Sequence, residues 1–276
     1  MSLVLYPPAR PQSIGEVIDT AFRIFKVTLL ACLPYSVLAT VAGQLQNIYL
    51  IVTGQTLRKF AYTEPAWWVL YLLGAFIGAM LINAILIRQA AAASGSPSVG
   101  SAALLDGLRK TPAAIAMGLL AAAIIGLCFI PLLVIPSPYQ PLSRLALCVP
   151  ALFVCVFLLC SWPALLIGRK GIVGSLRYSA NLVRGNWWRT VLIYAVAVNM
   201  IIVLSVTAGM IVGVLAAFGA ERDLAVTTAV SAVMVAASGA IYMPFITAMT
   251  LALYGDLQAR REGIDLERRI VGAPAS

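Results

Sequence analysis

The chain alternates long apolar runs with short stretches that carry its charges. Six runs contain no Asp, Glu, Lys or Arg: Val27–Val52, Ala66–Ile87, Pro112–Pro136, Leu145–Ile167, Val191–Ala217 and Val226–Tyr254. Each reaches the roughly 20 residues that a membrane-spanning helix needs. Backbone groups find no water in hydrocarbon, and a barrel would instead show alternating segments of about 10 residues. The pattern therefore predicts an all-α integral membrane protein with six transmembrane helices in one domain, residues 1–276.

The positions of the basic residues predict the orientation. Fifteen of the 19 Lys and Arg residues precede the first run, follow the sixth, or lie in the connections between runs two and three and between runs four and five. Basic residues gather on the cytoplasmic side, so we expect both termini on the cytoplasmic face of a prokaryotic inner membrane. The net charge of +9 then reflects topology and attraction to anionic lipids, and we expect no nucleic-acid partner. Membrane lipids are the expected partners, and a partner membrane protein or a homo-oligomer remains open.

Three basic segments have apolar residues at helical spacing: 13–26, 98–110 and 171–184. In the first, Ser13 and Glu16 stand at the positions of a capping box. Each segment precedes two apolar runs, which predicts three units of an interfacial amphipathic helix and a transmembrane hairpin, 13–87, 98–167 and 171–254, before a cytoplasmic tail, 255–276. Three unrelated basic connections are the alternative, because the units share little sequence identity.

The residues expected of an enzyme or a metal site are missing from the sequence. It has no histidine, and its five cysteines lie within apolar runs without a CxxC spacing. We therefore expect no enzyme activity, no metal and no cofactor. Within the runs, amides such as Asn83 and Asn199 either join helices or contact a substrate. Small-residue pairs, Gly74 with Gly78 and Gly209 with Gly213, and the ladder Gly118, Ala122 and Gly126 indicate close helix packing.

Charged and aromatic residues gather at the predicted cytoplasmic ends of the last runs. A lipid-headgroup site is one interpretation, because guanidinium groups bind phosphate and indoles lie at headgroup depth. Its candidate residues are Arg184, Arg189, Trp187, Trp188, Arg260 and Arg261. The other interpretation is a lock in which the tail carboxylates pair with these arginines. Its candidate carboxylates are Asp256, Glu262, Asp265 and Glu267.

Three motifs resemble bacterial proteins known as the glycerophosphoryl diester phosphodiesterase membrane domain family. They are Arg10-Pro11 with Ile14 to Phe22, Ser175 to Arg189, and Leu253 to Glu267. The pattern departs at Gly255 and Gln258, where the family has Tyr and Arg. The family's name comes from members fused to a catalytic domain that this sequence does not contain. The resemblance implies the architecture and no settled activity.

These features predict a non-enzymatic membrane protein that handles or organises lipid or another amphiphile, or assists a membrane partner. A transporter or channel with a path along helices bent at Pro131, Pro163 and Pro244 is the alternative. A cavity lined by Asn83 and Asn199 would favour transport. A groove rimmed by Arg184 and Arg189 would favour lipid handling.

Overall fold

A computed structural model describes residues 5–8, 10–53, 64–96, 100–133, 140–219 and 224–271; beside the gaps and beyond Arg261 it describes the backbone alone. These residues form helices and no strand. The helices are α1 (Ile14–Ala42), α2 (Leu45–Val52), α3 (Pro65–Ala93), α4 (Gly100–Leu127), a 3-10 turn η2 (Ile130–Leu133), α5 (Gln140–Leu158), α6 (Ser161–Leu166), α7 (Ile172–Val183), α8 (Trp187–Gly219) and α9 (Leu224–Val271). Six helical stretches are long and apolar enough to cross a membrane, which confirms the predicted fold class. The chain is a multi-pass membrane protein.

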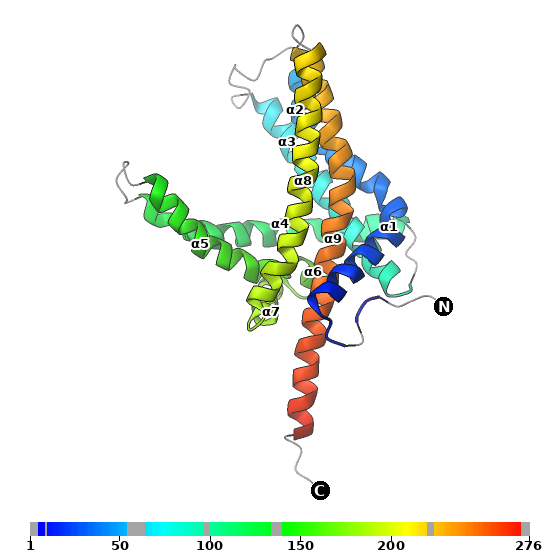
Figure 1. Ribbon diagram of the computed structural model, residues 1–276, viewed down its shortest axis with the longest axis vertical. Helices are drawn as coiled ribbons and strands as arrows, with labels where there is room; N and C mark the ends of the chain where they lie inside the picture. Colours follow the sequence, from blue (N-terminus) through cyan, green and yellow to red (C-terminus); the bar gives the residue numbers. More distant parts are fainter. Residues whose placement is uncertain are drawn as a thin grey trace.

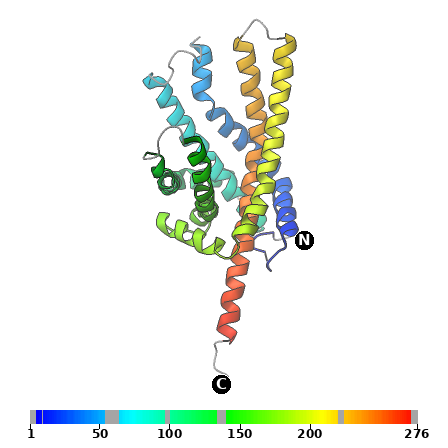
Figure 2. The same cartoon turned by 60° about the vertical axis from the view of Figure 1, so that its left-hand side comes forward.

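The centre of the molecule is the long helix α9. Helix α8 lies beside α9 for most of the length of α8, and α1 and α3 also pack against α9 (Figure 1). The helices α4 and α5 lean away from this group, while α7 crosses its direction (Figure 2). The main core consists of buried side chains from α1, α3 and α5 to α9, and Ile24, Ile193, Phe245 and Tyr254 are among its fully buried members.

The three amphipathic segments differ in how they meet the following span. The capping box is confirmed: Ser13 N–H donates to Glu16 Oε2 over 2.7 Å, and Glu16 N–H donates to Ser13 Oγ over 3.3 Å. From this cap α1 continues directly into the first apolar run, because no Gly or Pro lies between Glu16 and Leu33. The second segment likewise continues through Pro112 within α4. Only the third is a separate helix, since Gly185 at φ +89° ends α7.

Three further boundaries differ from the predicted runs. The first run is divided at Gly43 into α1 and α2, and the fourth is divided between α5 and α6. The sixth run continues as helix to Val271, so most of the predicted tail is part of α9. This end of α9 projects beyond the other helices (Figures 1 and 2). A length of 48 residues corresponds to about 72 Å at 1.5 Å per residue, far more than a bilayer core of about 30 Å.

Small residues bring α1, α3 and α9 into close contact. A Cβ at Gly239 of α9 would overlap Thr40 Cγ2 of α1, and a Cβ at Gly74 of α3 would overlap the carbonyl of Ala42. The first glycine pair therefore packs as the sequence predicts. A Cβ at Gly118 or Gly213 would meet nothing within 4 Å, so these two predicted packing glycines of α4 and α8 do not pack against the described part of the chain.

Pro244 lies inside α9 and has no N–H to donate to the carbonyl of Ala240. The Ser36 hydroxyl of α1 donates to that carbonyl over 2.9 Å. From α3, Gln89 Nε2 donates to the carbonyl of Pro244 over 2.8 Å. Neighbouring helices thus provide hydrogen-bond donors at this proline, as a helix in hydrocarbon requires.

Candidate functional site

A buried carboxylate joins α8, α9 and the N-terminal segment, defined here as residues 5–8 and 10–12. Asp256 of α9 is fully buried, and its Oδ2 accepts hydrogen bonds from Arg189 Nε and Arg260 Nε, each at 3.1 Å. Its Oδ1 accepts from the backbone N–H of Gln12 over 2.7 Å. Asp256 therefore has an ion pair with each arginine and a bond to the segment. A buried carboxylate is expensive unless it is paired in this way.

Both polar groups of the Gln12 backbone take part. Its carbonyl accepts from Nη2 of Arg189 and from Nη2 of Arg260, so each guanidinium group contacts Asp256 and Gln12 together. We call Gln12, Arg189, Asp256 and Arg260 the polar cluster. Two guanidinium groups and one carboxylate leave a net charge of +1, and the Gln12 carbonyl dipole points at the surplus positive charge. The cluster fixes the N-terminal segment to α8 and α9.

The N-terminal segment has a second attachment to α9. Tyr6 Oη donates to Gln258 Oε1 over 3.0 Å, and Gln258 Nε2 donates to Tyr178 Oη of α7 over 3.3 Å. At Gly255, a Cβ would lie 2.9 Å from Pro8 Cδ and 3.1 Å from a ring carbon of Tyr6. Gly255 and Gln258 are thus two further positions at which this segment contacts α9. A Tyr at residue 255 could not fit there without moving the segment.

The structure separates the predicted site residues into two groups. Arg189, Arg260 and Asp256 come together, as a tail lock requires. Arg184, Trp188 and Arg261 are exposed and lie outside the polar cluster. The side chains of Glu262, Asp265 and Glu267 lie outside the part that the structure describes.

Trp187 is half-buried and has a packing role. Its ring lies 5.1 Å from the ring of Phe153 in α5, and its Nε1 donates to the Phe153 carbonyl over 3.4 Å. This contact ties the start of α8 to α5. The side chain is therefore directed toward the protein rather than toward a lipid headgroup.

Sequence reasoning missed the N-terminal segment as part of this site. Gln12 acts through its backbone, which carries no residue-type signal. Tyr6 precedes the first motif, and Gln258 departs from the pattern of the third, so these two side chains were the available signals. Gln12 lies between the two parts of the first motif, Arg189 ends the second, and Asp256 belongs to the third. The three motifs that carry the family resemblance therefore meet at one point.

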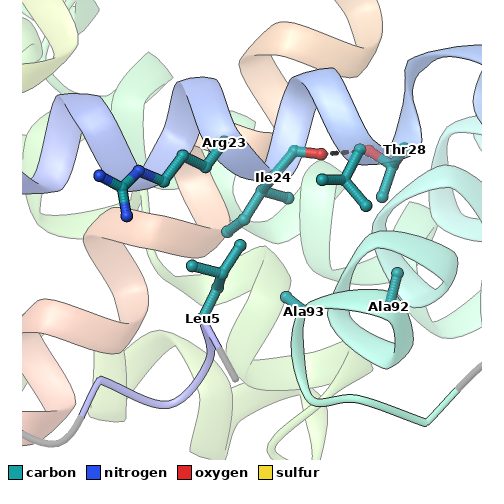
Figure 3. A pocket seen from close by; sticks show the side chains of 7 residues that line it. Leu5, Arg23, Ile24, Thr28, Ala92 and Ala93 are labelled. Atoms are coloured by element: carbon teal, nitrogen blue, oxygen red, sulfur yellow. Dashed lines mark hydrogen bonds between the residues drawn. The ribbon is translucent and has the colours of Figure 1, made fainter. Parts of the chain in front are cut away.

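Next to the N-terminal segment lies an apolar cavity of about 320 Å³ (Figure 3). Its lining comes from the segment, α1 and the end of α3. The lining residues are Leu5, Arg23, Ile24, Val27, Thr28, Ala92 and Ala93. Leu5 and Tyr6 are held there because their N–H groups donate to the Ala93 carbonyl over 2.8 and 3.1 Å.

The cavity has an apolar interior and a cationic rim. The Thr28 hydroxyl donates to the Ile24 carbonyl over 2.7 Å, so the one hydroxyl in the lining is already bonded. Arg23 is exposed and extends away from Ala92 and Ala93, which places its guanidinium at the rim (Figure 3). Among the described residues it enters no ion pair. Such a volume lies in the range of small-ligand sites, roughly 300–1,000 Å³.

The two amides named as transport candidates do not meet. Asn83 is buried, where its Nδ2 donates to Thr111 Oγ1 over 3.1 Å and its Oδ1 accepts from Trp162 Nε1 over 2.8 Å. Asn199 lies on the exposed face of α8. Within the described ranges, no three His, Cys, Asp or Glu residues are placed to hold a metal ion.

Searches of protein-family models, curated proteins and solved structures found no match to this chain. The family resemblance stays a prediction from the three motifs.

Proposed function

We propose that this protein is a non-enzymatic inner-membrane protein that binds a single-chain anionic amphiphile, or one chain of an anionic lipid. The observation that carries the proposal is the apolar cavity with Arg23 at its rim. Transfer of an acyl chain from water into the cavity would contribute about 25 cal/mol per Å² of apolar surface buried. A carboxylate or phosphate at the rim would meet the Arg23 guanidinium, which has a fork of donors for such groups.

The charge distribution supports a cytoplasmic position for the cavity in the proposed topology. It lies at the end of α1 that carries Arg23 and Lys26, on the side that the basic residues assign to the cytoplasm. The cytoplasmic leaflet is anionic, so a cationic rim at this depth would attract its lipids. The expected partner is therefore the lipid of that leaflet, with both chain termini on the same side.

The predicted lipid site at Arg184 and Arg189 is less suitable than Arg23. The guanidinium of Arg189 already binds Asp256 and Gln12, so a phosphate would have to displace a buried carboxylate. Transport also has little support from the two amides, since Asn83 is bonded within the protein and Asn199 is on the outside.

Binding can be tested with a fluorescent fatty acid and its uncharged methyl ester, titrated against the full chain in mild detergent. We expect Arg23→Gln to weaken the acid about tenfold or more, because a charge-assisted bond contributes roughly 1.5–3 kcal/mol, and to leave the ester unchanged. Ala92→Leu, which fills the cavity, should weaken both. The control is Lys26→Gln, on the same helix but outside the lining. Equal binding by wild type and Arg23→Gln, or equal loss with Lys26→Gln, would refute the site.

A further inference from the structure

The outer face of α8 carries a line of exposed positions, here called the seam, that no described residue covers. The positions follow one another from Trp188 at alternating steps of four and three residues, and each of them is exposed. The seam residues are Trp188, Leu192, Ala195, Asn199, Ile202, Val206, Gly209 and Gly213. The opposite face packs on α9, with Ile193 and Ala197 buried and Tyr194 Oη hydrogen-bonded to Thr250 Oγ1 over 2.6 Å. Steps of four and three are the repeat of a helix that packs along its length on another helix.

Lipid explains the apolar residues of this seam but not Asn199. This amide lies 12 residues into the stretch Trp187–Val214, which is long and apolar enough to span a membrane. Among the described residues its side chain forms no hydrogen bond. Hydrocarbon offers an exposed amide no partner, and such groups commonly bond across helices.

The glycines at the other end of the seam fit the same interpretation. A Cβ added at Gly209 or Gly213 would meet nothing within 4 Å, so neither glycine is needed for packing against the described residues of the chain. In spanning helices, glycines four residues apart allow two backbones to approach closely. Asn199 and the two glycines lie on one face, so one partner helix could contact all three.

We propose that this seam joins two copies of the chain through parallel contact between their α8 helices. The partner is a second copy of the chain, because two amides can bond only if they lie at the same depth in the membrane. Two copies inserted in one orientation place their Asn199 side chains at equal depth. A carboxamide is self-complementary, with N–H donors and a carbonyl acceptor, so the two amides bond to each other across a two-fold axis. A polar residue at one seam position also fixes the register of a helix pair. This proposal is independent of the cavity.

Disulfide trapping in native membranes tests the geometry. In a chain whose five native cysteines are replaced by Ala, we compare Val206→Cys on the seam with Thr207→Cys, its neighbour at the same depth but about 100° around the helix. We expect oxidation to give a covalent dimer at residue 206 and little at residue 207. Equal yields, or no dimer at residue 206, would overturn the proposal.

The affinity of the two copies for each other in vesicles tests the Asn199 amide and the glycine pair separately. The fraction of dimer is measured by single-molecule photobleaching. We expect Asn199→Leu to weaken association about 3- to 30-fold, the range for interhelical bonds in membranes of roughly 0.6–2 kcal/mol. We expect Gly213→Leu to separate the copies. Gly118→Leu is the matched control, because that glycine of α4 also has open space around it. A monomeric wild type, or equal effects of Gly213→Leu and Gly118→Leu, would contradict the α8 interface.

Discussion

Replacing Asp256 by Asn changes one oxygen to an NH₂ group in the most buried ion pair of the described structure. The Asn carbonyl can accept either from Gln12 N–H or from the two arginines, and the NH₂ group must then face donors on the other side. Breaking a buried pair in this way costs about 3–5 kcal/mol. The Arg189 and Arg260 side chains are 16% and 27% exposed to solvent, and both still donate to the Gln12 carbonyl. We therefore expect the substitution to lower the free energy of unfolding by about 3 kcal/mol, the low end of that range.

Unfolding in mixed micelles with a rising mole fraction of dodecyl sulfate, followed by circular dichroism, measures this loss. The matched control is Arg10→Gln, which breaks the pair of Arg10 with Glu16 at 2.7 Å, where the side chains are 75% and 41% exposed. An exposed pair contributes at most about 1 kcal/mol. If Asp256→Asn is as stable as wild type, or no less stable than Arg10→Gln, the N-terminal segment is not held by the polar cluster.

Two further predictions concern packing and topology. Gly239→Val should lower the free energy of unfolding by about 1–3 kcal/mol, because the side chain overlaps Thr40, whereas Gly118→Val, with open space around it, should cost less than half as much in the same titration. In intact cells and a cysteine-free background, an impermeant thiol reagent should label Thr53→Cys directly and Ser94→Cys only after permeabilisation, because the positions of the basic residues predict that Ser94 is cytoplasmic. Labelling of Ser94→Cys from outside would contradict the predicted topology.

The spans could be predicted from the sequence because a membrane helix needs only an unbroken apolar run, a local property. The helix cap at Ser13 was predictable for the same reason. Whether an amphipathic segment bends away from its span was not, because that depends on single residues such as Gly185. The sequence also could not show that α1 packs most extensively on α9, at the other end of the chain.

The candidate site was predicted in part. Opposite charges at helix ends suggested that Asp256 pairs with Arg189, but equally suggested Arg184, which stays exposed. Only the fold determines which guanidinium reaches the carboxylate. The Gln12 backbone meets residues at least 177 positions away, and the cavity forms where Leu5 and α1 meet the end of α3, so no local pattern could reveal either feature.

The pairing of α1 with α9 has a consequence for biosynthesis. Roughly 180 residues separate the two helices, so at about 5–20 residues per second α1 enters the membrane roughly 10–40 s before its main partner exists. During that interval the Ser36 hydroxyl can donate to the Leu33 carbonyl of its own helix, 2.9 Å away. When α9 is inserted, the same hydroxyl can donate to the Ala240 carbonyl, which Pro244 leaves without a donor. Helix α1 can thus remain in lipid with its Ser36 hydroxyl hydrogen-bonded. Assembly is complete only when α9 packs against it.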